Sequence, residues 1–257
     1  MSESIAFDRA ADYYDATRTL TPEAEAGVVE LLAPELEHRR PCLEIGVGTG
    51  RIALPLLRAG IDLVGVDLSL PMLSRLAQKL GNGDRLPVAL ADATRLPVAD
   101  QSVGAVLACH VLHLIPAWQD AARELARVLR PDGIFLLDLG GGPGGEWRAI
   151  VRKVAEELGI TRPRPGLTDA DPLDRLLTGL GASVRPLAPV RIVRRQPLAD
   201  ALEELGSQIH SWTWDIPPVA MRTAVASTRE WAASRFGDLD EPRDVEAVIK
   251  WRAYDWR

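Results

Sequence analysis

The sequence predicts an α/β protein whose doubly wound, mostly parallel sheet carries helices on both faces. Two observations lead to this prediction. In residues 41–139, short apolar runs rich in β-branched residues alternate with longer segments that have apolar residues at helical spacing. The first run also leads directly into a glycine-rich turn that is followed by a helical pattern. Strands and helices that alternate in this way form right-handed crossovers and lie parallel in one sheet.

Five strands and three helices are expected in this region. The strands begin near Cys42, Asp62, Leu86, Val103 and Gly133, and the helices cover 50–58, 69–80 and 117–129. Upstream, a helix is expected from Thr21 to about Leu36, because Thr21 is a capping residue and is followed by a proline and acids in the first turn. The N-terminal part of the chain is therefore also helical.

The second half of the chain differs in composition. The run GGGPGG after residue 139 predicts a flexible joint, residues 162–166 are rich in proline and arginine, and five of the seven tryptophans lie beyond residue 200. Helices are expected at 146–158, 172–180, 197–208 and 218–236. Two late strands, at 184–194 and 245–256, would join the same sheet and bring it to seven strands.

Composition excludes several classes of protein. The formal net charge of −6 arises from 36 acidic and 30 basic residues, and the basic residues form no block that would attract a phosphate backbone. The N-terminus lacks the positive charge and apolar run of a signal peptide, and no apolar run is long enough to span a membrane. The two cysteines both lie in apolar runs. We expect a cytoplasmic protein that binds neither nucleic acid nor a membrane.

The glycine-rich turn reads Gly46-Val47-Gly48-Thr49-Gly50 and follows the first strand directly. Glycines at such a turn allow a tight bend and a close approach of the backbone to a ligand, although a bare turn explains them too. The dinucleotide fingerprint starting at Gly46 would need its third glycine at position 51, where Arg51 stands. A nicotinamide cofactor is therefore disfavoured.

Two carboxylates accompany this turn. Asp67 ends the second strand, where its carboxylate can accept hydrogen bonds from both ribose hydroxyls of an adenosine ligand. The alternative is that Asp67 only caps the helix that begins at Ser69. Glu44, two residues before Gly46, is expected to point into the crevice at the sheet's carboxyl end and would suit a cationic ligand. It is alternatively a solvent-exposed carboxylate at a strand end.

Four segments in succession resemble the motifs of class I S-adenosylmethionine-dependent methyltransferases. These segments are CLEIGVGTGRIALPL, VGVDLSLPML, ADATRLPVADQSVGAVLACHVLHLIPAW and RELARVLRPDGIFLL. The likeness is greatest to the small-molecule group with the ubiquinone and menaquinone C-methyltransferases (methyltransferase domain type 11), and it covers about residues 5–140. It implies a Rossmann-like fold and S-adenosylmethionine as the cofactor. Residues 1–257 would then form a single domain, with a cofactor-binding core at 41–139 and a substrate lid or insertion at 140–215.

The resemblance also assigns cofactor contacts. It implies that Gly46 and Gly48 face the methionine part of the cofactor, and that Asp67 binds the ribose. Leu68 and Met72 would pack against the adenine. Gly50 completes the glycine loop.

Further contacts are implied by neighbouring strand ends and by the N-terminal segment. Asp92, followed by Ala93, would accept a hydrogen bond from the adenine amino group, unless it only caps the next turn. Tyr14 and Arg18 would reach the bound cofactor from a helical segment, although a surface salt bridge explains Arg18 equally well. Cys109 would contribute its backbone.

His110 and His113 follow the fourth strand at the mouth of the expected crevice. A histidine at this place can act as a general base, although a histidine packed on the following helix is commoner. The histidines have no partner ligands at zinc-type spacing, so we predict no metal. Trp212 and Trp214 alternate with hydroxyl residues and would line a substrate pocket, or else anchor the late helices.

We therefore expect an enzyme that transfers a methyl group from S-adenosylmethionine to a small-molecule acceptor. The transfer would be an in-line displacement that depends mainly on positioning. Two alternatives remain: a non-catalytic S-adenosylmethionine-binding structural or regulatory protein, and a dehydrogenase, which Arg51 disfavours. The motif Asn-Pro-Pro-Tyr of enzymes that methylate DNA bases or glutamine is absent after the fourth strand. No sequence feature fixes the acceptor atom or an oligomeric state.

Overall fold

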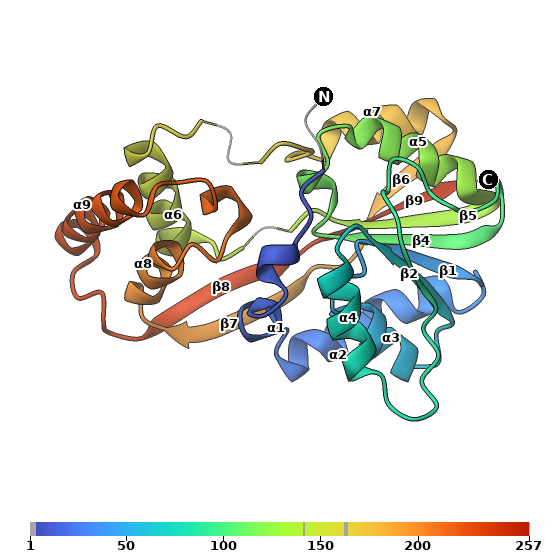
Figure 1. The fold of residues 1–257 in the computed structure, drawn as a ribbon, viewed down its shortest axis with the longest axis horizontal. Helices are drawn as coiled ribbons and strands as arrows, with labels where there is room; N and C mark the ends of the chain where they lie inside the picture. The colour runs from blue at the N-terminus through green and yellow to red at the C-terminus, as the bar shows by residue number, and fades with distance from the viewer. Residues whose placement is uncertain (1–3, 141, 162–163, 257) are drawn as a thin grey trace. The chain divides into compact units, whose positions relative to one another are not determined.

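The computed structural model describes residues 4–140, 142–161 and 164–256. Gly141 of the predicted joint and residues 162 and 163 of the proline- and arginine-rich segment lie outside the described residues. The chain divides into two compact units (Figure 1). The first unit comprises Met1–Gly140, Pro165–Val190 and Lys250–Arg257, and the second comprises Gly141–Arg164 and Arg191–Ile249.

The first unit is built around a seven-stranded sheet with the order β3-β2-β1-β4-β5-β9-β6. Strands β1 to β5 run parallel to one another, and β9 is antiparallel to its neighbours β5 and β6. This confirms the predicted mostly parallel sheet of seven strands. The strands are β1 (Cys42–Ile45), β2 (Leu63–Asp67), β3 (Val88–Leu90), β4 (Val103–Cys109), β5 (Leu129–Asp138), β6 (Ala182–Pro186) and β9 (Trp251–Trp256).

The strand order reverses next to β1, because the chain continues on one side to β2 and β3 and later returns to the other side with β4. In open α/β sheets, ligands bind at the carboxyl ends of the strands at such a switch point. The register brings the ends of neighbouring strands level: Ile45 pairs with Val66 and Ala108, and Cys109 pairs with Asp138. The side chains that follow these ends therefore lie close together.

Helices cover both faces of this sheet, as predicted. In Figure 1, α2, α3 and α4 lie on one face, and α5 and α7 lie on the other. Thr21 caps α2 as predicted, because its Oγ1 accepts a hydrogen bond from the Ala24 N–H. Ser69 caps α4 in the same way, with Oγ accepting from the Met72 N–H. The helical elements of this unit are η1 (Asp8–Ala10), α1 (Tyr14–Arg18), α2 (Pro22–Leu36), α3 (Ala53–Arg58), α4 (Leu70–Lys79), η2 (Leu112–Leu114), α5 (Trp118–Val128) and α7 (Asp171–Gly179).

The core of the first unit lies between β4, β5, α5 and α7. Every residue of β4 is buried, as expected for a central parallel strand covered on both faces. Phe135 of β5 stacks on Tyr254 of β9, with ring centroids 5.4 Å apart. The Tyr254 hydroxyl donates a hydrogen bond to Asp174 Oδ1 of α7 at 2.7 Å. These contacts fix the antiparallel strand β9 inside the sheet.

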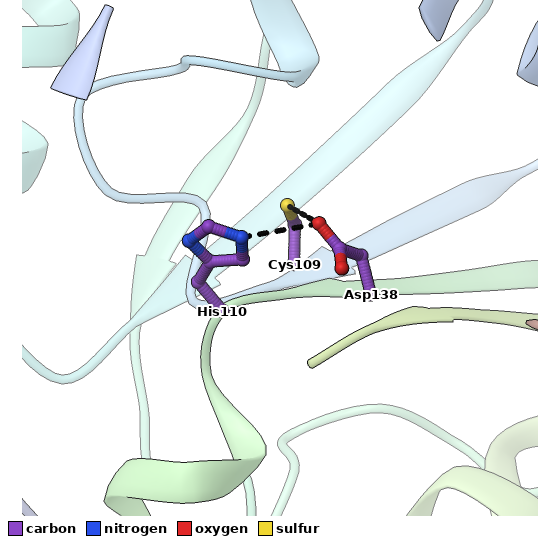
Figure 2. A group of neighbouring side chains, drawn as sticks. All are labelled: Cys109, His110 and Asp138. Atoms are coloured by element: carbon purple, nitrogen blue, oxygen red, sulfur yellow. Dashed lines mark hydrogen bonds and ion pairs between the residues drawn. The ribbon is translucent and has the colours of Figure 1, made fainter. Parts of the chain in front are cut away.

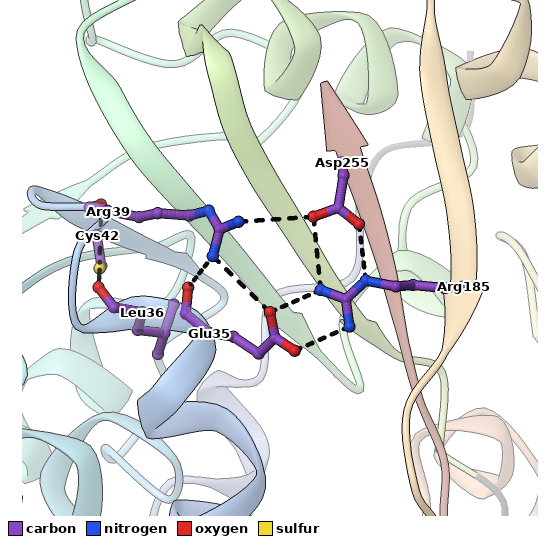
Figure 3. Close-up of polar contacts among 6 residues, drawn as sticks. All are labelled: Glu35, Leu36, Arg39, Cys42, Arg185 and Asp255. Atoms are coloured by element: carbon purple, nitrogen blue, oxygen red, sulfur yellow. Dashed lines mark hydrogen bonds and ion pairs between the residues drawn. The ribbon is translucent and has the colours of Figure 1, made fainter. Parts of the chain in front are cut away.

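A network of charged side chains joins α2 to the edge of the sheet (Figure 3). Arg185 of β6 pairs with Glu35 of α2 at 2.6 Å and with Asp255 of β9 at 2.8 Å. Arg39, just after α2, lies 3.8 Å from each of the same two carboxylates. The side chains are between 19% and 41% exposed, so solvent screens the network and its contribution to stability is modest.

The second unit is mainly helical and has a core of its own. Its helices pack around buried residues such as Trp147, Ile150, Leu202 and Met221. Strands β7 and β8 form a separate two-stranded sheet. Its elements are α6 (Gly145–Glu157), β7 (Val190–Gln196), α8 (Ala199–Gly206), η3 (Ser211–Thr213), α9 (Pro218–Phe236) and β8 (Arg243–Ile249). Residues 165–190 of the expected lid belong to the first unit, and the second unit continues past residue 215 to Ile249.

The two late strands were predicted wrongly in part. Each forms two strands, of which only β6 and β9 join the main sheet, whereas β7 and β8 pair with each other. Pro186 ends β6, and Pro189 precedes β7. Proline has no N–H to donate, so a single strand cannot continue through this stretch within the sheet.

Over the residues that the structure describes, no helix combines the length and apolar composition needed to cross a membrane.

Candidate active site

A cleft in the first unit opens where β1, β2, β3 and β4 end. It is lined by most of the residues that were predicted to bind the cofactor, together with His110, one of the two predicted catalytic histidines. The predicted residues that line it are Tyr14, Gly46, Gly48, Asp67, Leu68, Met72, Asp92, Ala93, Cys109 and His110. The sheet's switch point and the predicted site therefore coincide.

The glycine turn after β1 forms one wall of the cleft. Gly46 has φ +64°, and a Cβ there would lie only 2.7 Å from Val111 Cγ2, in the loop after β4. A side chain at position 46 would therefore strain the backbone and displace Val111. Gly46 thus lets the loops after β1 and β4 approach each other.

Gly50, the third glycine of the turn, does not line the cleft. Its φ is +83°, and a Cβ there would lie 2.6 Å from Leu76 Cδ1 and 2.7 Å from Leu54 Cγ. The third glycine therefore lets α3 and α4 pack closely behind the turn. Its predicted contact with the cofactor stays a prediction.

The variant Gly50→Ala should lower the free energy of unfolding by about 1–3 kcal/mol more than Gly60→Ala, because overpacking adds to backbone strain. Gly60 is a matched control: its φ is +84°, yet a Cβ there meets no atom within 4 Å. Urea unfolding of both variants gives the comparison. Equal losses of stability would show that Leu54 and Leu76 move aside freely.

Asp67 lies at the end of β2 and is held by backbone donors. Its Oδ2 accepts a hydrogen bond from the Gly48 N–H and its Oδ1 accepts one from the Ser69 N–H, both at 2.8 Å. Burial raises the pKa of this carboxyl above its ordinary value, while the backbone N–H groups act in the opposite direction. Asp67 therefore both caps the turn before α4 and lines the cleft, and each carboxylate oxygen retains a further lone pair for a ligand hydroxyl.

Asp92 combines a cap and a cleft position in the same way. Its Oδ1 accepts hydrogen bonds from the Thr94 N–H at 2.8 Å and from Thr94 Oγ1 at 2.9 Å. Met72, which is buried, and Leu68, which is 37% exposed, also line the cleft. Carboxylates and apolar side chains are thus both present at this end of the cleft.

Glu44 was expected to point into the crevice, but it is 2% exposed and is not among the residues that line the cleft. Burial raises the pKa of its carboxyl to about 8, and the nearby charge of Arg51 opposes this shift. Among the described residues, its Oε2 has no hydrogen-bond partner. A buried acceptor of this kind is costly unless something compensates it, so Glu44 is a candidate partner for a cationic group.

In the sequence, Arg51 stands out only as a departure from the dinucleotide fingerprint. In the structure, its Nη2 donates to Cys109 Sγ at 3.1 Å. Its charge also interacts with Tyr14, Asp138 and Glu44. Arg51 is therefore the cation at the centre of a mostly buried group of titratable side chains, and no sequence spacing indicated this.

Cys109, His110 and Asp138 meet where β4 and β5 end (Figure 2). His110 Nε2 lies 3.1 Å from Asp138 Oδ2, and Cys109 Sγ lies 3.6 Å from the same oxygen. Burial favours the neutral acid at Asp138, but the hydrogen bond and charge of His110 outweigh it and hold the pKa of this carboxyl below its ordinary value. Asp138 was not predicted, although it ends a strand as Asp67 does.

These three side chains are spaced closely enough to hold a metal ion, since their ligand atoms lie within 4.8 Å of one another. Two features oppose a metal here. Burial raises the pKa of the Cys109 thiol, whereas a metal ligand must be a thiolate. The guanidinium of Arg51 also lies beside the sulfur. The absence of a metal stays a prediction.

The remaining predicted residues are not among those that line the cleft. His113 is buried in η2, and its carbonyl accepts a hydrogen bond from the Gly166 N–H. Arg18 donates to the carbonyl of Thr17. Trp212 packs against the core of the second unit. Trp214 also belongs to this unit. Roles for these residues in catalysis or binding stay predictions.

The comparisons with known proteins agree with this geometry. Residues 43–137 match the family described as "Methyltransferase domain". The chain is 34% identical over 178 residues to the uncharacterised methyltransferase Rv3342 of Mycobacterium tuberculosis, a match that covers 64% of this chain and 67% of that protein. It is 35% identical over 130 residues to a demethylmenaquinone methyltransferase of Streptomyces avermitilis, covering 49% of this chain and 55% of the relative.

A similar fold occurs in the crystal structure of the YcgJ protein of Bacillus subtilis. The TM-score is 0.61 at 17% sequence identity, over 90% of this chain and 99% of the other. At this identity the likeness concerns the fold alone. Taken with the family match, the glycine turn and the strand-end carboxylates, it leads to one assignment: the chain belongs to the methyltransferase domain family and is an S-adenosylmethionine-dependent methyltransferase.

Proposed function

We propose that the cleft of the first unit binds S-adenosylmethionine and that the protein transfers the methyl group to a small-molecule acceptor. The observation that supports this most strongly is the Asp67 carboxylate. It is oriented by two backbone N–H groups and stands in a cleft that begins at the glycine turn. A fixed carboxylate at this strand end suits the two ribose hydroxyls of an adenosine ligand.

The residues present fit the cofactor at three further points. Asp92 lines the cleft and can accept a hydrogen bond from an amino group such as that of adenine. Gly46 and Gly48 leave the turn without side chains next to the cleft. The buried carboxyl of Glu44 stands two residues before Gly46, and a cationic ligand beside it would favour its ionised form. An anionic pyrophosphate would oppose that ionisation.

The protein's contribution to the reaction is positioning. When bound, S-adenosylmethionine supplies a methyl group that the positive sulfonium has already made electrophilic. The polar residues hold the ligand at the strand ends, and apolar side chains such as Phe7, Leu114 and Ile115 keep water out of the cleft. Holding two reactants in line can lower a barrier by roughly 7–11 kcal/mol in the best intramolecular cases. An in-line displacement therefore needs no covalent intermediate with the protein.

A small acceptor is supported by the relatives and by the charge. One relative carries the name demethylmenaquinone methyltransferase, which describes a small-molecule acceptor. The net charge of −6 disfavours a nucleic acid. The alternative, a protein that binds the cofactor without turnover, has no specific observation in its favour.

Two measurements test the proposal. Calorimetric titration should show micromolar binding of S-adenosylmethionine and S-adenosylhomocysteine and none of NADH. The enzyme is then incubated with methyl-labelled S-adenosylmethionine and a cell extract, and the small-molecule, protein and nucleic-acid fractions are counted. Label should enter the small-molecule fraction and fall when S-adenosylhomocysteine is added. Binding without transfer to any fraction would support the non-catalytic alternative, and label in a macromolecule would refute a small acceptor.

A further inference from the structure

The pair formed by His110 and Asp138 connects the cleft to the core. The side chain of Asp138 is 4% exposed, whereas that of His110 is 32% exposed and lines the cleft. The nitrogen that faces the carboxylate is Nε2, and Nδ1 lies on the opposite side of the ring (Figure 2). A buried carboxylate thus holds one side of an imidazole that is accessible from the cleft.

The backbone around the pair holds it in this geometry. His110 has φ +56°, which is uncommon outside glycine. Its N–H donates to the Asp138 carbonyl at 2.8 Å, and the Gly140 N–H donates to Asp138 Oδ1 at 2.8 Å. A Cβ at Gly140 would lie 2.8 Å from His110 Nε2, so only glycine leaves room for the ring. Strained conformations of this kind persist where surrounding contacts enforce them, and they are frequent at functional sites.

We infer that His110 is the general base of the methyl transfer and that Asp138 is its positioning residue. This rests on the proposed function, because it needs an acceptor in the cleft. The acceptor oxygen or nitrogen forms a bond to the methyl carbon, the electron pair of the carbon–sulfur bond stays on the departing thioether, and the acceptor proton passes to His110 Nδ1. Asp138 keeps Nε2 protonated and stabilises the imidazolium.

The inference specifies a class of acceptor. A carboxylate or a thiolate is already ionised when it attacks and needs no base. A hydroxyl, an amine or an acidic carbon must lose a proton, and only such an acceptor needs His110 as a base. The acceptor is therefore a compound that loses a proton when it is methylated, and a hydroxyl or an amine is the simplest case.

Other titratable groups surround the pair and belong to any account of its pH dependence. Cys109 lies on β4 beside Asp138, and Arg51, Glu44 and Tyr14 approach from the glycine turn, β1 and α1. Arg51 favours the ionised form of Asp138. Burial raises the pKa of Cys109 and of Tyr14, so these two groups are neutral near pH 7 and do not compete for the role of the base.

The first experiment measures the reactivity of His110 itself. The protein is treated with diethyl pyrocarbonate and modification of each histidine is followed by mass spectrometry, with the exposed His38 as the internal reference. His110 should be modified in the free protein, and bound S-adenosylhomocysteine should slow its modification at least fivefold without affecting His38. If His110 is not modified in the free protein, its ring is closed off from the cleft and the inference fails.

The second experiment uses catechol and benzylamine as acceptor probes, with benzoate as a probe that has no proton to lose. His110→Gln should lower kcat for catechol or benzylamine at least 100-fold. Asp138→Asn should lower it at least tenfold and shift the pH profile. Both variants should bind S-adenosylhomocysteine within threefold of the wild type, and His38→Gln should match the wild type throughout. Methylation of benzoate alone, or an unchanged pH profile in His110→Gln, would overturn the inference.

The two experiments separate this inference from the proposed function. If S-adenosylhomocysteine does not bind the wild-type protein, the proposed function itself fails. If S-adenosylhomocysteine binds and protects His110, the histidine lies beside the cofactor, and the pH profiles of the two variants then decide whether it is the base. If it binds and His110 is unreactive, only the general base is refuted.

Discussion

Replacing Asp67 by alanine is expected to weaken the binding of S-adenosylmethionine and of S-adenosylhomocysteine by at least about 100-fold. Hydrogen bonds to a charged group contribute roughly 1.5–3 kcal/mol each, and the variant removes two of them to the ribose. Calorimetric titration measures the change. Asp67→Asn, which keeps one acceptor oxygen and nearly the same shape, should show a smaller loss.

A matched control for this prediction lies on the same strand. Asp62 is exposed just before β2, at the end of the strand remote from the cleft, so Asp62→Ala should bind both ligands as the wild type does. Because Asp67 also accepts hydrogen bonds from the Gly48 and Ser69 N–H groups, circular dichroism and thermal unfolding must show that Asp67→Ala is folded. Wild-type affinity in a folded Asp67→Ala protein would exclude Asp67 from the cofactor site.

Glu44 should make cofactor affinity depend on pH. Burial raises the pKa of its carboxyl to about 8, so the carboxyl is neutral in the free protein below this pH. A cationic ligand prefers the ionised form, and the affinity should therefore rise by up to about tenfold per pH unit towards pH 8 and then level off. Between pH 6 and pH 8 the change would reach about 50-fold.

Calorimetry in buffers of different ionisation enthalpy should detect the release of up to one proton on binding near pH 7. Glu44→Gln should abolish the proton release. The pH dependence of affinity that remains in this variant should come from the amino group of the ligand alone. Proton release of equal size in wild type and Glu44→Gln would show that Glu44 does not interact with the ligand.

The same group should affect the stability of the ligand-free protein. Its pKa is raised on folding, so between about pH 5 and pH 8 the native state holds a proton that the unfolded state has lost. Stability should therefore fall as the pH rises through this window, by at most about 1.4 kcal/mol per pH unit. Urea unfolding of wild type and Glu44→Gln measures this slope, which the variant should lack.

Local patterns along the chain were sufficient for much of the first unit. The glycine turn at Gly46 and the carboxylates of Asp67 and Asp92 all stand where strands end, and a parallel sheet places such ends along one edge. Helix boundaries were also predictable, because capping residues such as Thr21 and Ser69 act on N–H groups only three residues away. Each of these features depends on residues close in the sequence.

The late strands and the role of Trp212 could not be predicted in this way. The apolar patterns around residues 184–194 and 245–256 correctly predict extended backbone, but they do not identify the partner strand, so the separate β7–β8 sheet was missed. Trp212 is compatible with a pocket or with a core, and the structure packs it against the second unit's core. Partner choice is a property of the whole fold and not of the segment.

The sequence by itself determined the class of the sheet, the place of the glycine turn and the carboxylates that follow β2 and β3, because these depend on short-range pattern and on the geometry of parallel strands. Only the tertiary structure decided that Asp138 faces His110, that Arg51 lies beside Cys109, and that Glu44 is buried. The physical reason is register: Cys109 and Asp138 are adjacent only because β4 and β5 pair as they do, and no local pattern encodes that alignment.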